Sequence, residues 1–126
     1  MDEPVRISEQ GDGTLEVALF GDIDFANAST IRETVRAVVA EAAPTAIRVD
    51  LAAVTFLDSS GIALLVTAHR LAAGLGARYS VVNPTSTVYE HLRLTGLAGL
   101  FGVARPTAGG PRDVPGADRS SPPVGR

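Results

Sequence analysis

Hydrophobic and polar residues alternate in two short stretches near the N-terminus, residues 5–8 and 14–20. Such alternation is typical of a strand that buries one face and exposes the other. Between the two stretches lies the run Gln-Gly-Asp-Gly, which is a strong turn signal. This part of the chain is therefore predicted to form an antiparallel hairpin.

The next stretch, residues 25–43, changes to a period of three to four residues. Its apolar stripe consists of Ile31, Val35, Val38 and Ala42. This spacing predicts an amphipathic helix that ends before Pro44.

The start of this helix has two possible signals. Thr30 followed by Glu33 fits a capping box. Asp24 could instead cap a helix that begins about a turn and a half earlier. The sequence leaves both starts open.

The remaining pattern alternates strands and helices. Strands are predicted at residues 46–51 and 78–83, and helices at 60–73 and 86–95. Repeated strand–helix–strand steps favour a mixed sheet with parallel neighbours and right-handed crossovers. The prediction is an α/β fold with a small mixed sheet of about four to five strands and helices packed mainly on one face.

Composition divides the chain into a folded body, residues 1–105, and a tail, residues 106–126. The tail holds five of the eight prolines and almost no large apolar residue. Such a segment cannot bury enough surface to offset the entropy of ordering, so we expect it to be disordered. The body is long enough for one domain.

Charge and residue usage exclude several classes of function. The net charge is −3, which does not suit a general nucleic-acid binder. Cysteine and lysine are both absent, which excludes disulfides, thiol or Schiff-base chemistry and a Walker A lysine. With only two histidines, no metal site is expected, and no cofactor. Neither a secretory signal nor an apolar span of about 20 residues is visible, so a cytoplasmic protein without membrane contact is expected.

The most informative motif is Asp58-Ser59-Ser60-Gly61, at the start of the apolar helix 60–73. A helix N-terminus presents unpaired N–H groups and the positive end of the helix dipole, which together favour a phosphate. The Ser59 hydroxyl is therefore a candidate phosphoryl acceptor. The plainer alternative is that Asp58 and Ser59 only cap the helix.

A second motif, Gly21-Asp22-Ile23-Asp24, follows the second strand. Its two carboxylates could bind a cation or act as an acid–base pair, but a turn and a helix cap explain them equally simply. If this loop lies beside the start of helix 60–73, then Asp22, Asp24 and Asp58 form an acidic rim around Ser59.

An enzyme is not expected. Ser59 and His69 belong to no G-x-S-x-G elbow and lie ten residues apart on one predicted helix, so a hydrolase triad is excluded. The glycines Gly74 and Gly76 follow a helix rather than a strand, and they complete no dinucleotide fingerprint.

Residues 49–65, which contain the Asp58–Gly61 motif, resemble the signature of STAS-domain anti-sigma factor antagonists. Gly21 and Asp24 match that family's Gly-x-x-Asp, and Leu94-Thr-Gly-Leu resembles the end of its third helix. The likeness covers about residues 5–103. It implies the STAS fold, a small mixed sheet with helices mainly on one face.

The resemblance also implies a role in partner switching. In the family, the unmodified antagonist binds an anti-sigma factor that is also a serine kinase, and so frees a sigma factor. Phosphorylation of the serine that matches Ser59 ends this binding, and a serine phosphatase can reverse it. The partner-binding rim implied for this chain comprises Asp22, Asp24, Asp58, Ser60 and Gly61, with Asp24 matching the family aspartate beside the phosphorylation site.

One departure and two alternatives accompany the resemblance. After Phe101 the family continues with a strand and a final helix, whereas here we expect at most a short strand at 101–103 and no final helix. A first alternative is a STAS interaction module of a transport or stress-sensing scaffold assembly without a phosphorylation switch. A second is a small enzyme or nucleotide binder, which no convergent set of residues supports.

Overall fold

The computed structural model describes residues 3–106. The tail predicted to be disordered lies, apart from Pro106, outside the described residues. Within residues 3–106 the chain forms four strands and four helices. In chain order they are β1 (Val5–Glu9), β2 (Thr14–Ile23), α1 (Phe25–Ala42), β3 (Ala46–Leu57), α2 (Ser59–Leu75), β4 (Arg78–Val82), α3 (Ser86–Leu94) and α4 (Leu97–Leu100).

The strands form one mixed sheet in the order β1-β2-β3-β4. β1 and β2 are antiparallel, as the hairpin signal predicts, and Val5 lies opposite Leu19. β2–β3 and β3–β4 are parallel pairs, each joined by a helix. The predicted α/β fold with a small mixed sheet is thus confirmed.

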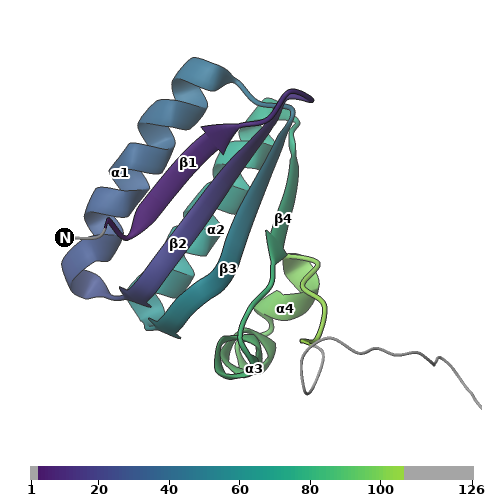
Figure 1. Ribbon diagram of the computed structural model, residues 1–126. Coiled ribbons are helices and arrows are strands. Elements are labelled where there is room, and N and C mark those ends of the chain that lie inside the picture. The colour runs from purple at the N-terminus through teal and green to yellow at the C-terminus, as the bar shows by residue number, and fades with distance from the viewer. Residues whose placement is uncertain (1–2, 107–126) are drawn as a thin grey trace, which may run out of the picture.

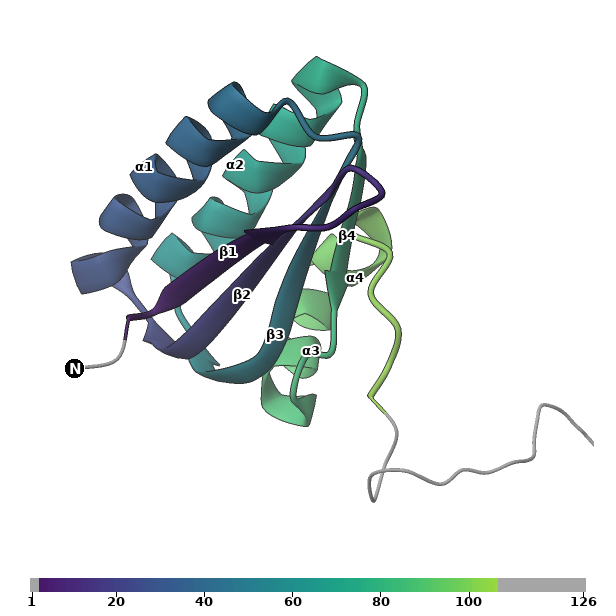
Figure 2. The ribbon, with the colours of Figure 1, turned by 45° about the horizontal axis from the view of Figure 1, so that its top comes forward.

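The helices gather on one face of the sheet, as predicted. Figure 2 shows α1 and α2 side by side along one face of the sheet, and both views place α3 and α4 near β4 (Figures 1 and 2). The inward side chains of β2 and β3, such as Leu15, Val17 and Val49, are buried beneath these helices. The opposite face is open, and there Arg48 pairs with Glu16 across a distance of 2.8 Å.

The end of the fold differs from the sequence prediction. Residues 101–103 form no strand: Phe101 caps the one-turn helix α4, and its ring is buried beside His69 and Tyr79. The Tyr79 hydroxyl donates a hydrogen bond to the carbonyl oxygen of Leu65 in α2 at 2.8 Å, and burial raises the Tyr79 pKa. An aromatic cluster thus closes the core where a fifth strand was expected. The expectation that no final helix follows concerns residues beyond 106, outside the described part.

Two strands also run further than predicted. β2 continues to Ile23 rather than ending at Phe20, and β3 continues to Leu57 rather than ending near Leu51. Register shifts after Ala18 and after Gly21 interrupt the alternation of buried and exposed residues, so the sequence pattern fades while the pairing persists. This extension carries both strands directly to the caps of the following helices.

For α1, the structure selects the earlier of the two starts. Asp24 caps the helix and forms a capping box with Asn27, so the Thr30 alternative is wrong. The buried stripe runs through Ile31, Val35 and Val39, whereas Val38 is only half-buried. The predicted helix is confirmed, and Ile31 and Val35 lie on its inward face as expected, but the centre of that face includes Ala28 and Val39, while Val38 and Ala42 pack at its edge.

The packing of Phe101 can be tested by its removal. Phe101→Ala deletes a ring that is 1% exposed and should lower the free energy of unfolding by about 3–5 kcal/mol. Leu100→Ala, next to it but 56% exposed, is the matched control and should change it by less than about 0.5 kcal/mol. Urea denaturation followed by circular dichroism measures both, and similar small losses would show that the C-terminal segment is not part of the core.

Candidate functional site

Two helices begin side by side at one edge of the sheet. β2 and β3 are parallel neighbours, and their last residues, Ile23 and Leu57, lie opposite each other. A single capping residue follows each strand, Asp24 before α1 and Asp58 before α2. The carboxyl ends of the strands and the N-termini of both helices therefore meet at one edge, at the lower end of Figure 1.

The Asp58 carboxylate joins the two helices. One oxygen, Oδ1, accepts hydrogen bonds from the backbone N–H of Ser60 at 2.8 Å and of Gly61 at 3.1 Å. The other, Oδ2, accepts from the backbone N–H of Phe25, the first residue of α1, at 3.2 Å. Helix N-termini leave such donors unpaired, so one half-buried side chain satisfies donors of both helices.

The two acidic residues of the Gly21–Asp24 motif are also held in place. Asp24 accepts a hydrogen bond from the backbone N–H of Ala26 at 3.0 Å, and Asn27 donates to the backbone carbonyl of Asp22 at 2.9 Å. The Asp22 carboxylate accepts from the Thr55 hydroxyl at 2.5 Å. The sequence motif thus forms the end of a strand and a helix cap, not a free loop.

Ser59 occupies the first position of α2 and is exposed, whereas Ser60 is half-buried and Gly61 is buried. Of the two adjacent hydroxyl groups, the Ser59 hydroxyl is the more open to solvent. The structure therefore places the candidate acceptor at a helix N-terminus, directly after the carboxylate that links both helices.

Gly61 is where α2 contacts the sheet. A Cβ atom at this position would lie 2.8 Å from Cγ of Leu57 and 3.0 Å from the carbonyl oxygen of Ile23. Since contacts under 3.0 Å require something to shift, only glycine lets the first turn of α2 approach this closely. Gly61 thus lets the first turn of α2, which carries Ser59, pack directly against the ends of β2 and β3.

The site is acidic. Asp22, Asp24 and Asp58 all adjoin the two helix starts, and none of them takes part in an ion pair within residues 3–106. No group of three or more potential metal ligands is found in that same part of the chain. The carboxylates therefore act as hydrogen-bond acceptors here and give no support to the cation-site interpretation.

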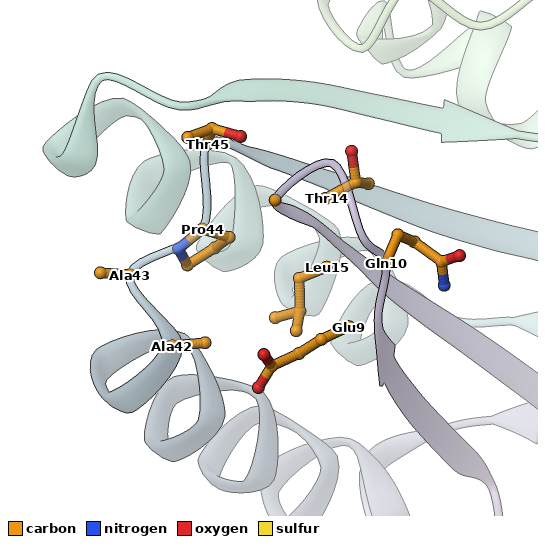
Figure 3. A pocket seen from close by; sticks show the side chains of 9 residues that line it. Glu9, Gln10, Thr14, Leu15, Ala42, Ala43, Pro44 and Thr45 are labelled. Atoms are coloured by element: carbon orange, nitrogen blue, oxygen red, sulfur yellow. The ribbon is translucent and has the colours of Figure 1, made fainter.

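One surface hollow of the domain lies away from this site, and a second lies next to it. The pocket of Figure 3 lies between the β1–β2 turn and the end of α1, and Glu9 is the only ionisable side chain that lines it. A second hollow of about 290 Å³ lies between α1 and α2, next to the site. Its lining residues are Phe25, Ala28, Ser29, Arg32, Ser60 and Ala63.

Sequence reasoning missed three residues near the site. Phe25 is 84% exposed at the start of α1, Phe56 is 49% exposed near the end of β3, and Arg32 lines the hollow. The available signal was Phe25, an aromatic residue directly after a helix cap, at a position that normally faces solvent. It could not be interpreted without knowing that Asp24, rather than Thr30, begins the helix.

The fold and the site agree with comparisons to known proteins. A mixed sheet with helices on one face and an Asp-Ser-Ser-Gly helix start define a STAS-type domain. The family model described as the STAS domain matches residues 6–108, and the chain belongs to this family. The resemblance drawn from the sequence is thereby confirmed.

The similar relatives are named anti-sigma factor antagonists. The chain is 33% identical over 90 residues to the anti-sigma-F factor antagonist RsfB of Mycobacterium tuberculosis, which covers 71% of each chain. It is 29% identical over 84 residues to an anti-sigma F factor antagonist of Lysinibacillus sphaericus, covering 67% of this chain and 72% of the relative.

Solved structures show the same similarity. The unphosphorylated anti-sigma factor antagonist SpoIIAA superposes with a TM-score of 0.71 at 25% identity, covering 82% of this chain and 89% of that one. An anti-sigma factor antagonist from Mycobacterium paratuberculosis gives a TM-score of 0.71 at 31% identity, covering 82% and 86%. Among the helices described, none has both the length and the hydropathy to span a membrane.

The close approach at Gly61 predicts a position-specific loss of stability. Gly61→Ala should lower the free energy of unfolding by about 1–3 kcal/mol, because the new methyl group meets a side chain and a backbone carbonyl. Gly74→Ala, in the same helix but with nothing within 4 Å, is the control and should stabilise by about 0.5–1 kcal/mol. Urea titration of both variants is decisive, and equal effects would contradict the packing described here.

The double role of Asp58 predicts a larger loss than an ordinary cap gives. Asp58→Ala removes the acceptor of three backbone N–H donors on two helices and should cost about 2–3 kcal/mol of unfolding free energy. Thr85→Ala removes the cap of α3, which accepts from Val88 alone, and should cost about 1 kcal/mol. If chemical denaturation gives the same loss for both, the bond to Phe25 contributes nothing.

Proposed function

We propose that this protein is an anti-sigma factor antagonist, which in its unphosphorylated form binds an anti-sigma factor with serine kinase activity and thereby frees a sigma factor. Phosphorylation of Ser59 ends that binding, and a serine phosphatase restores it. The relatives with the name anti-sigma factor antagonist support this role. It is a cytoplasmic, non-enzymatic role that requires no cofactor of the protein itself.

The observation that carries the proposal is the position of Ser59. Its side chain is exposed at the first position of α2, directly after the Asp58 carboxylate that holds both helix starts. A kinase can therefore reach the hydroxyl without unfolding the domain. The oxygen Oγ attacks the γ-phosphorus of ATP, ADP leaves, and the hydroxyl proton passes to a base of the kinase.

The switch follows from charge. A phosphoserine adds about −1.5 to −2 charge at neutral pH, beside three carboxylates that are already present. Asp58 already occupies the N–H groups of Ser60 and Gly61, but the positive end of the α2 dipole still favours an anion nearby, so the fold persists while the surface becomes strongly anionic. A desolvated, unpaired charge at an interface costs several kcal/mol, and about 3 kcal/mol already reduces affinity more than a hundredfold.

The proposal predicts one acceptor out of two adjacent serines. The purified protein is incubated with ATP and each candidate anti-sigma factor kinase of its source organism, and the phosphorylated residue is mapped by mass spectrometry. Phosphate should appear on Ser59. Ser59→Ala should abolish transfer, whereas the matched Ser60→Ala variant should still be phosphorylated.

Binding is then compared for the unmodified and the phosphorylated protein with the same kinase by isothermal titration. A loss of at least a hundredfold in affinity on phosphorylation is expected. Undiminished transfer to the Ser59→Ala variant would move the acceptor elsewhere. Equal binding of both forms would refute the switch and favour an interaction module without one.

A further inference from the structure

Two phenylalanines flank the candidate acceptor and are exposed. Phe25 is 84% exposed and Phe56 is 49% exposed, whereas Phe101 is 1% exposed in the core. Neither exposed ring belongs to the hydrophobic core or to the half-buried residues packed against it. Since neither ring contributes to the core, their placement at this edge calls for another reason.

Both residues are held by the elements that form the site. The Phe25 backbone N–H donates to Asp58, the residue before Ser59, and Phe56 lies opposite Asp22 in the sheet. Their backbones are therefore fixed before any partner arrives. Aromatic side chains rotate about only two side-chain bonds, so they lose little entropy on binding, and at the centre of an interface they often dominate its energy.

A groove leads away from Phe25 along the two helices. Besides Phe25 it is lined by the small residues Ala28 and Ala63, and by Arg32 further along α1. The Arg32 guanidinium lies 3.4 Å from the Ser29 hydroxyl and 3.8 Å from Glu33, which is itself exposed. The surface thus combines the exposed Phe25 ring, a largely apolar groove and the Arg32 cation. It lies next to the acidic rim formed by Asp22, Asp24 and Asp58.

From this surface, and on the basis of the function proposed above, we propose that the anti-sigma factor kinase docks on Phe25, Phe56 and the groove that runs to Arg32, with Phe25 as the principal contact. A kinase that transfers phosphate to Ser59 must cover the residues directly around it, and Phe25 is hydrogen-bonded to the preceding residue. Its complementary surface has an apolar socket for Phe25 and a carboxylate that faces Arg32.

The charges argue against a second copy of this chain as the occupant. A symmetric dimer formed through this surface would bring the same residues of both copies together. Asp22, Asp24 and Asp58 would then approach their own equivalents, and such like-charge contacts are unfavourable. A partner that brings no carboxylates to these positions fits better.

The test measures the affinity of single variants for the kinase that phosphorylates Ser59 in the assay above. Phe25→Ala should weaken binding at least tenfold, and Phe56→Ala by a smaller factor. The matched control is Leu75→Ala, an apolar residue that is 46% exposed at the far end of α2, about 24 Å from Ser59 along the helix axis. It should change the affinity less than twofold.

Two further measurements separate the possible outcomes. The thermal unfolding midpoint of Phe25→Ala should match that of the unmodified protein, because its ring is exposed. Arg32→Glu should weaken binding more than Arg32→Ala if a carboxylate faces this position; equal effects would refute that pairing. Sedimentation should show the same mass for Phe25→Ala and the unmodified protein, and a dimer lost in the variant would assign the surface to a second copy instead.

The results distinguish this inference from the proposed function. If Ser59 is phosphorylated and binding is switched, but Phe25→Ala binds like Leu75→Ala, the docking surface is wrong and the function stands. If no kinase phosphorylates Ser59 or binds the protein, both proposals fall together.

Discussion

The carboxylate of Asp58 is the interaction on which the site depends. Parallel pairing of β2 and β3 brings two helix starts to one edge, and this creates a concentration of unpaired backbone donors. Asp58 satisfies three of them, from Phe25, Ser60 and Gly61. Without it, these three donors would lose their acceptor, and the hydrogen bond that joins the start of α1 to the start of α2 would be absent.

The same carboxylate explains how a phosphate can act here without refolding the domain. The inner donors are already occupied by Asp58, so a phosphoryl group on the exposed Ser59 hydroxyl projects outward from this edge. It would then meet the positive end of the helix dipole on one side and carboxylates on the other. Because these two effects oppose each other, we expect the phosphorylated domain to stay folded. The partner then responds to the changed surface charge and not to a change in the backbone.

The sequence predicted the order of the elements as far as α3, because strand and helix periods are local properties of the chain, but it did not predict the one-turn helix α4. It missed the last residues of β2 and β3, because register shifts break the alternation where the pairing continues. It identified Asp58 as a cap but not its bond to Phe25, since these residues are 33 positions apart. The buried ring of Phe101 was equally invisible: its partners, His69 and Tyr79, come from α2 and β4.

The first turn of α2 has a structural side and, in the proposed function, a recognition side. Gly61 faces Leu57, the last residue of β3, and determines how closely the helix approaches the sheet. Ser59 faces solvent, close in the fold to Phe25 and Phe56, which the core does not need. Because stability and recognition rest on different residues of one turn, a charge added at Ser59 can change binding while the fold is kept. This separation is what a surface switch requires, and a buried serine at the same position would couple the two properties.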